Sequence, residues 1–103
     1  MSEVHIVFVT CPPERAPVLA RALVEARVAA CVNILPGVRS IYRWKDAVQD
    51  DAEALLLIKA PVAGFEALRQ EILKLHPYEL PEIVAVKLDD GHPAYLDWVL
   101  SSC

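Results

Sequence analysis

The stretch C-V-N-I-L-P-G-V-R-S-I-Y-R-W-K-D-A-V-Q-D-D-A-E-A-L-L-L-I-K-A, residues 31–60, indicates the fold more clearly than any other part of the chain. Its first half predicts a strand over residues 31–44, because apolar and β-branched side chains recur along it. The pair Pro36-Gly37 interrupts that strand and predicts a bulge or a bend. Residues 45–51 are polar and predict a turn, and the apolar residues 53–60 predict the next strand.

These two strands and their turn form a predicted hairpin that is long for a chain of 103 residues. Its distal part, around Tyr42, Arg43 and Trp44, is expected to project past the helices. An exposed strand edge of that length invites pairing with another chain. The chain also has 55% apolar residues, more than a small monomer needs to fill its core. Both observations favour a homo-oligomer.

The segments on either side of the hairpin alternate between strand and helix patterns. A β-branched run predicts a strand from Val4 to Thr10, and Ile83 to Leu88 predicts the last strand. Two helices are predicted between strands, the first opened by Pro12-Pro13 and the second stopped by His76-Pro77. Their expected buried faces are formed by Leu19, Ala22, Leu23 and Ala26, and by Phe65, Leu68, Ile72 and Leu75. After a turn at residues 89–91, residues 93–100 predict a short C-terminal helix.

The resulting order, β-α-β-β-α-β with a last helix, predicts an α+β fold of the ferredoxin-like type. Such a fold has a four-stranded antiparallel sheet with two helices on one face. The length predicts one domain over residues 1–103.

Composition excludes several function classes. The net charge is −4 and no basic stretch occurs, so a nucleic-acid partner is not expected. The three glycines lie far apart, which excludes glycine-rich phosphate loops. No apolar run approaches the ~18 residues of a membrane span, and no targeting segment is evident. We therefore expect a cytoplasmic protein without a membrane partner.

The three cysteines, Cys11, Cys31 and Cys103, form no C-x-x-C pair. Their odd number argues against a disulfide scaffold and against a structural zinc site. We expect Cys31 to be a small buried side chain and Cys103 to be a free thiol near the chain end.

Four strings resemble the CutA1 family of divalent-ion tolerance proteins. They are A-L-V-E-A-R-V-A-A-C-V-N-I-L-P-G-V-R-S-I-Y-R-W (residues 22–44), L-L-L-I-K (55–59), H-P-Y-E-L-P-E-I (76–83) and Y-L-D-W (95–98). The resemblance implies a ferredoxin-like protomer that forms a tight trimer through the long hairpin. It also implies a link to tolerance of copper and other divalent cations, and a fold similar to that of the trimeric PII signalling proteins.

The chain departs from this family where copper ligands have been proposed. Those ligands include a cysteine on the first strand and two adjacent histidines before Pro-Tyr. The strand position here is Val9, and the first histidine position is Leu75, so that only His76 remains.

The segment His76 to Glu82 holds the densest set of functional side chains. In one interpretation, His76 and Glu82, with Glu79 as a further candidate, share a cation, because imidazole and carboxylate suit copper or zinc. Copper or zinc is therefore the only candidate cofactor. In the alternative interpretation, the two prolines stiffen the connection, His76 caps the helix, and Tyr78 and Glu82 make hydrogen bonds.

The other clusters favour structural roles. Tyr42, Arg43 and Trp44 are expected to pack across a subunit boundary, where these residue types are enriched, although an aromatic ligand patch is an alternative. The pairs Asp50-Asp51 and Asp89-Asp90 are interpreted as solvated turn residues. No combination of serine, cysteine and histidine in the sequence predicts nucleophilic catalysis, so a non-enzymatic protein is expected.

Two functional hypotheses follow. In the first, the protein is a cytoplasmic homotrimer that binds or responds to divalent metal ions such as copper. In the second, it is a PII-like signalling adaptor or small-ligand sensor, and effects on metals are indirect. An unidentified enzyme with a site between subunits is a third alternative.

Overall fold

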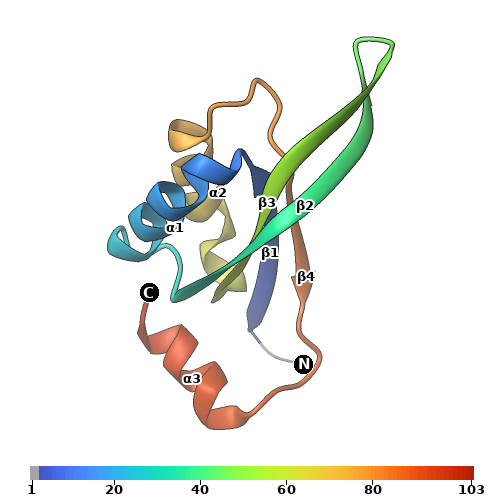
Figure 1. The fold of residues 1–103 in the computed structure, drawn as a ribbon. Coiled ribbons are helices and arrows are strands. Elements are labelled where there is room, and N and C mark those ends of the chain that lie inside the picture. Colours follow the sequence, from blue (N-terminus) through green and yellow to red (C-terminus); the bar gives the residue numbers. More distant parts are fainter. Residues whose placement is uncertain (1–2) are drawn as a thin grey trace.

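The computed structural model describes residues 3–103, which form one antiparallel sheet with α1 and α2 on one face and α3 at one end of the other face (Figure 1). The sheet has the strand order β2-β3-β1-β4, and α1 and α2 connect strands that are not neighbours. This is the ferredoxin-like arrangement that the sequence predicts. The elements are β1 (Val4–Cys11), η1 (Pro13–Arg15), α1 (Ala16–Glu25), β2 (Cys31–Trp44), β3 (Ala47–Pro61), η2 (Val62–Gly64), α2 (Phe65–Leu75), β4 (Ile83–Lys87) and α3 (Pro93–Ser101).

The core lies between the sheet and helices α1 and α2. Alternate residues of the two central strands face the helices, because strand side chains alternate between the two faces of a sheet. Val7 pairs with Ile58 and Val9 with Leu56, and all four side chains are fully buried. The helices contribute buried leucines and isoleucine at helical spacing, namely Leu19, Leu23, Leu68 and Ile72. Val9 is therefore a core residue.

The first helix differs from its prediction at both ends. A short 3-10 helix follows Pro12, and α1 begins only at Ala16. The predicted buried face is correct for Leu19 and Leu23 but wrong for Ala26, which is exposed. The helix ends at Glu25, and Arg27 has a φ of 61°, so that the chain turns away before Ala26 can reach the core. The second helix ends at Leu75 before His76-Pro77, as predicted.

The hairpin of β2 and β3 contains the predicted irregularity at Pro36-Gly37. The pairing register shifts between Leu35 and Val38, and Gly37 has a φ of 77°, which glycine adopts without steric cost. The predicted turn over residues 45–51 is wrong in extent, because Ala47 already pairs with Trp44. Only Lys45 and Asp46 form the turn, with φ values of 50° and 66°. Such a two-residue turn matches the twist of the strands, which allows the polar residues after it to continue as strand.

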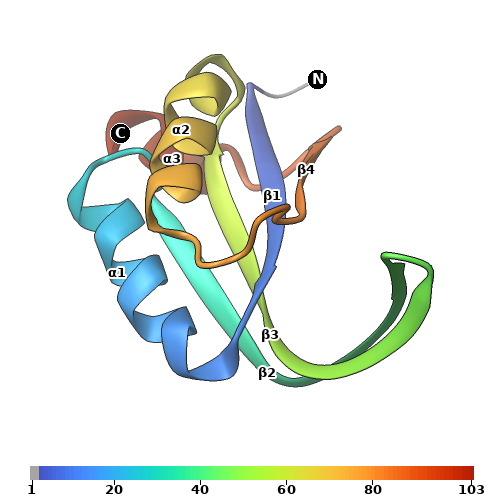
Figure 2. The same ribbon diagram turned by 90° about the horizontal axis from the view of Figure 1, so that it is seen from above.

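Residues 38–53 form the hairpin arm, in which β2 and β3 pair only with each other. The arm extends beyond the helices (Figure 1) and curls to one side (Figure 2). The described residues accordingly have an elongated outline of 44 × 26 × 23 Å. The predicted projection of the hairpin is thus confirmed.

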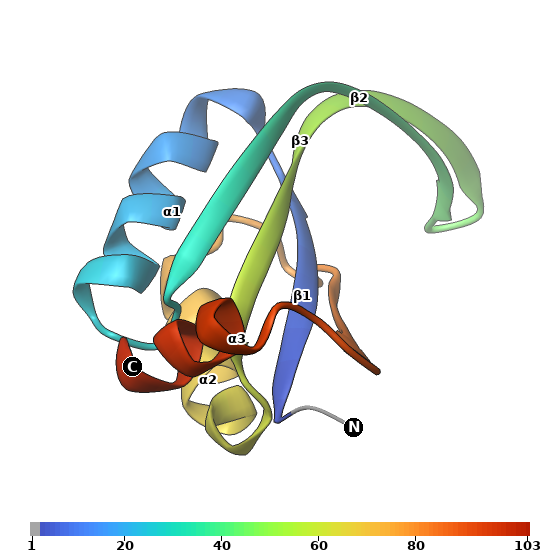
Figure 3. The ribbon, with the colours of Figure 1, turned by 90° about the horizontal axis from the view of Figure 1, so that it is seen from below.

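The sheet face opposite α1 and α2 is apolar and largely uncovered. Phe8 pairs with Leu57 and Val84, so the three side chains form a row across that face. Val84 is 52% exposed. The helix α3 packs against Val4 through Val99 and covers only one end of the face (Figure 3). The remaining apolar surface is a candidate interface.

The cysteines are all free, but they differ in burial. Cys11 is buried on the helix-covered face, and Cys103 is exposed. The prediction of a buried Cys31 is wrong, since its side chain is only half-buried. Cys31 pairs with Lys59, which lies on the sheet face opposite the helices. No helix among residues 3–103 is both long enough and apolar enough to span a bilayer.

Candidate functional site

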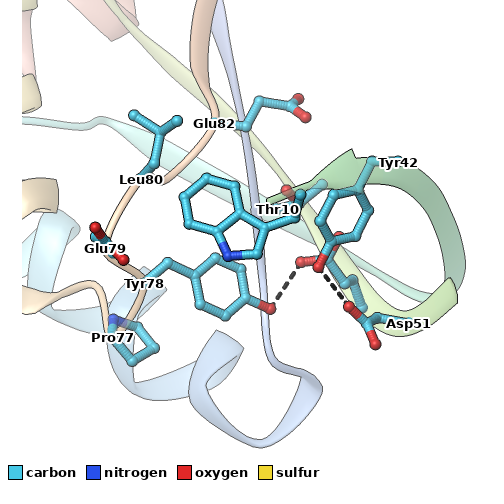
Figure 4. A pocket seen from close by; sticks show the side chains of 10 residues that line it. Thr10, Tyr42, Asp51, Pro77, Tyr78, Glu79, Leu80 and Glu82 are labelled. Carbon is cyan, nitrogen blue, oxygen red and sulfur yellow. Dashed lines mark hydrogen bonds between the residues drawn. The ribbon is translucent and has the colours of Figure 1, made fainter. Parts of the chain in front are cut away.

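A groove of about 490 Å³ lies between the curled hairpin arm and the loop that joins α2 to β4. Its walls come from three parts of the chain that are distant in sequence: the end of β1, the arm, and the loop (Figure 4). The lining residues are Thr10, Tyr42, Trp44, Asp51, Glu53, Pro77, Tyr78, Glu79, Leu80 and Glu82.

Strand alternation selects which arm residues line the groove. Tyr42 and Trp44 are two positions apart on β2 and share one face, whereas Arg43 lies on the opposite face. Asp51 and Glu53 are likewise two positions apart on β3, and both line the groove. The structure therefore brings Tyr42 and Trp44 together and separates both from Arg43. Whether these three residues contact another subunit stays a prediction.

Two tyrosine hydroxyls donate hydrogen bonds to two carboxylates of the groove (Figure 4). The Tyr78 hydroxyl donates to Oε2 of Glu53 at 2.8 Å, and the Tyr42 hydroxyl donates to Oδ2 of Asp51 at 2.5 Å. Burial and the bond to Glu53 raise the pKa of Tyr78 well above its usual range, and the bond to Asp51 raises the pKa of Tyr42. A phenol is protonated near neutral pH in any case, so both hydroxyls act as hydrogen-bond donors to these carboxylates.

His76 connects the loop to β1 through hydrogen bonds at both nitrogens of its ring. Its Nδ1 accepts a hydrogen bond of 3.1 Å from the backbone N–H of Tyr78. The ring proton is then on Nε2, which donates to the carbonyl of Thr10 at 2.8 Å. His76 is 8% exposed, and its ring packs against the ring of Tyr78, with the centroids 4.8 Å apart. His76 thereby places Tyr78 over Glu53.

This geometry bears on the predicted cation ligands. Both ring nitrogens of His76 are engaged, so an ion at either nitrogen would displace a hydrogen bond to the backbone. Glu82 and Glu79 line the groove and are exposed. Within residues 3–103, no three side chains among His, Cys, Asp and Glu are grouped as metal ligands. Leu75, at the other histidine position of the family, packs against the core. The pair His76 and Glu82 as a metal site stays a prediction.

The charged side chains that line the groove are all acidic. Four carboxylates line it, from Asp51, Glu53, Glu79 and Glu82, and no lysine or arginine is among the lining residues. Lys45 adds a positive charge at the rim, where its Nζ lies 3.8 Å from Oε2 of Glu79 and 5.6 Å from the centroid of the Trp44 ring. This arrangement repels phosphates and other anions and attracts cations.

Sequence reasoning missed the central residues of the groove. The sequence predicts Asp51 as a solvated turn residue, but it lies in β3 and accepts a hydrogen bond from the Tyr42 hydroxyl. Glu53 was not singled out, although it is 5% exposed at the point where the arm meets the sheet. One signal in the sequence could have revealed it: Glu53 is an acidic residue directly before the apolar run 54–58.

Comparisons with known proteins agree on one family. The family model described as CutA1 divalent ion tolerance protein matches residues 5–102. The divalent-cation tolerance protein CutA of Thermus thermophilus is 50% identical over 96 residues, which is 92% of this chain and 93% of that protein. Protein CutA of Mus musculus is 45% identical over 97 residues, and the match covers 93% of this chain but only 55% of the mouse protein.

Solved structures show the same likeness in three dimensions. The divalent cation tolerance protein Cut A1 from Thermus thermophilus superposes with a TM-score of 0.93 at 47% identity, covering 96% of this chain and 97% of that chain. A protein from Nostoc sp. PCC 7120, described as the PII-like protein CutA in apo form, has a TM-score of 0.90 at 43% identity and covers 95% of each chain. The fold is thus that of CutA1 and PII-like proteins. Taken with the match over residues 5–102, these findings show that the chain belongs to the CutA1 divalent ion tolerance protein family.

Proposed function

We propose that this protein is a homotrimer that acts without catalysis in the response of the cytoplasm to divalent cations such as copper. The observation that carries this proposal is family membership over residues 5–102, because the family and its Thermus relative are both described by tolerance of divalent ions. The three free cysteines agree with a reducing compartment such as the cytoplasm. Among the relatives, the protein of Arabidopsis thaliana is described as chloroplastic.

The uncovered apolar surfaces support the assembly. Val84 and Val86 on the open sheet face are 52% and 56% exposed, and Ile41 and Val48 on the hairpin arm are 67% and 66% exposed. Exposed apolar side chains that gather on one face are typical of sites where protein chains associate. A second and a third copy would cover both surfaces. Of the predicted contact residues on the arm, Arg43 shares the face of Ile41, whereas Tyr42 and Trp44 face the groove.

The assembly is tested by the mass of the protein in solution. Light scattering or sedimentation is expected to give three times the protomer mass of 11.4 kDa. A single species at the protomer mass across the micromolar range would contradict the proposal.

The metal proposal is tested by titration with Cu(II) and Zn(II) in a buffer that contains glycine as a competing chelator. Copper heads the affinity order of divalent ions for nearly any site with nitrogen and oxygen ligands, so the competitor is essential. If His76 and Glu82 hold an ion, binding will survive competition in the natural protein and disappear in His76→Ala and in Glu82→Gln. The matched control is His92→Ala, which removes an exposed histidine outside the groove. Equal binding by all four proteins would contradict the assigned ligands.

A second candidate function is that of a small-ligand sensor. The groove favours it, because its carboxylates and aromatic rings surround a volume far larger than one metal ion. The likeness to the Nostoc protein described as PII-like points in the same direction. In this function, a ligand in the groove would stabilise the native state by mass action.

A further inference from the structure

We propose that the groove between the hairpin arm and the loop 77–82 binds a linear organic polycation, an aliphatic polyamine. The inference rests on the small-ligand function proposed above and names the chemical class of the ligand. It follows from four features of the groove, which concern its charge, an incompletely bonded carboxylate, its aromatic walls and its size.

The charge of the groove favours a cationic ligand. Its four carboxylates stand on two opposite walls, with Asp51 and Glu53 on the arm and Glu79 and Glu82 on the loop. In residues 3–103, acidic side chains are not gathered into a group of three that one ion could bridge. A ligand with several positive charges spaced along a chain can meet carboxylates that are spread out in this way.

Glu53 has spare hydrogen-bonding capacity at the base of the groove. Its side chain is 5% exposed, and its Oε2 accepts a hydrogen bond from Tyr78. That phenol is the one side-chain donor to Glu53 among residues 3–103. A carboxylate oxygen can accept more than one hydrogen bond, so Glu53 has capacity for a further donor beside the Tyr78 hydroxyl. An ammonium group in the groove would supply a further donor.

The aromatic residues suit an alkylammonium. Tyr42, Trp44 and Tyr78 line the groove, and ring faces attract a positive charge within about 6 Å of the centroid. The chain itself contains an example of this recognition. The ammonium of Lys45 lies 5.6 Å from the Trp44 centroid and 3.8 Å from a carboxylate oxygen of Glu79. An ammonium is therefore already placed between a ring and an acid at the rim of the groove.

The size of the groove suits a diamine or a longer polyamine. Ligand pockets have volumes of about 300–1,000 Å³, and the groove, at about 490 Å³, lies within that range. Methylene segments between the amines would contact the rings and Leu80, while the amines meet the carboxylates on either wall.

The test is a calorimetric titration of the assembled protein with spermidine at physiological salt concentration, with thermal unfolding measured on the same samples. MgCl₂ at equal ionic strength controls for general screening of the acidic surface. We expect saturable binding of spermidine and a rise in Tm that MgCl₂ does not reproduce. Binding should weaken at least tenfold in Glu53→Gln and in Trp44→Leu, and change less than twofold in the matched control Asp97→Asn, whose carboxylate lies on α3 outside the groove.

Three outcomes would overturn the proposal: no binding of spermidine by the natural protein, an equal response to MgCl₂, or equal affinities in the groove variants and in Asp97→Asn. The first outcome includes the case in which a basic side chain of a second copy fills the groove. Because Glu53 is buried, Glu82→Gln replaces Glu53→Gln if the latter fails to fold; Glu82 is exposed on the other wall. Mass and copper titration on the same samples keep failure here distinct from failure of the trimer or metal proposals.

Discussion

Strands β2 and β3 run through two regions of the molecule, the four-stranded sheet packed against α1 and α2 and the two-stranded hairpin arm, and different interactions stabilise each region. Under the helices, Leu56 and Ile58 of β3 are fully buried, and burial of such a side chain contributes about 1.5–3 kcal/mol. In the arm, the large apolar side chains of Ile41 and Val48 are two-thirds exposed. The arm is stabilised instead by the backbone hydrogen bonds between β2 and β3 and by exposed ion pairs. In one of them, a guanidinium nitrogen of Arg39 lies 2.7 Å from Oδ2 of Asp50.

This difference shows which region needs a partner. A two-stranded hairpin alone is marginally stable in water, and exposed ion pairs add little. The packed region is stable through its own core, whereas the arm lacks a buried face within one protomer. We infer that the arm owes its order to what covers it in the assembly.

The largest expected effect compares two positions of β3. Leu56→Ala should lower the free energy of unfolding by about 2–5 kcal/mol, because it leaves a cavity in the core. Val48→Ala, in the arm, leaves the protomer core intact and should cost less, about 1 kcal/mol, through lost contact with another copy. Urea denaturation at fixed protomer concentration measures both. Similar losses at the two positions would refute the contrast between the regions.

The next effect concerns assembly. Ile41→Asp places a charge on the exposed apolar surface of the arm and should weaken association at least tenfold, about 1.4 kcal/mol. Val18→Asp is the matched control, because Val18 is 64% exposed on α1, away from the arm. Sedimentation over a range of concentrations reports the dissociation. If Val18→Asp dissociates the protein and Ile41→Asp does not, the helices rather than the arm form the contact.

A smaller effect is expected at the bulge where the arm begins. Gly37→Ala should cost about 1 kcal/mol, because Gly37 has a φ of 77° and nothing lies within 4 Å of the added methyl group. The cost is thus conformational and not steric. Gly64→Ala is the control, since it has equal space and a φ of −94°. Thermal unfolding of the two variants should separate them, and an equal loss would assign the cost to something other than backbone strain.

The smallest effect is a pH dependence in the packed region. Burial lowers the pKa of His5, whose Nε2 is buried without a hydrogen-bond partner among the described residues. The unfolded chain therefore binds this proton more readily, so stability falls as the pH drops below the ordinary histidine value of about 6.5. His5→Leu should flatten the dependence of unfolding free energy on pH between about 6.5 and 5. Unchanged pH dependence in the variant would show that another group titrates.

Most of the fold could be predicted because its signals are local. The buried face of α2, at Phe65, Leu68, Ile72 and Leu75, follows from helical spacing, and its end follows from the restriction before Pro77. The errors lie where tertiary structure overrides a local pattern. The polar residues after Asp46 were predicted as a turn, but pairing with β2 continues them as strand.

The candidate site was predicted only in part. The segment 76–82 was identified from its dense functional groups, and the structural interpretation of His76 agrees with its two hydrogen bonds to the backbone. Asp51 and Glu53 were missed as groove residues, because nothing local links them to Tyr42 and Tyr78. Their partners are 9 and 25 positions away in the chain.

By itself, the sequence determined the order of the elements, the long hairpin and the resemblance to the family, because periodicity, proline and glycine positions and motif strings are all read along the chain. Only the tertiary structure decided that the arm curls over the loop, that His76 bonds to Thr10 across 66 positions, and that four carboxylates and three aromatic rings meet in one groove. The physical reason is that contacts between residues distant in the sequence depend on the register and twist of the strands and on core packing. Those are properties of the whole folded chain rather than of any segment.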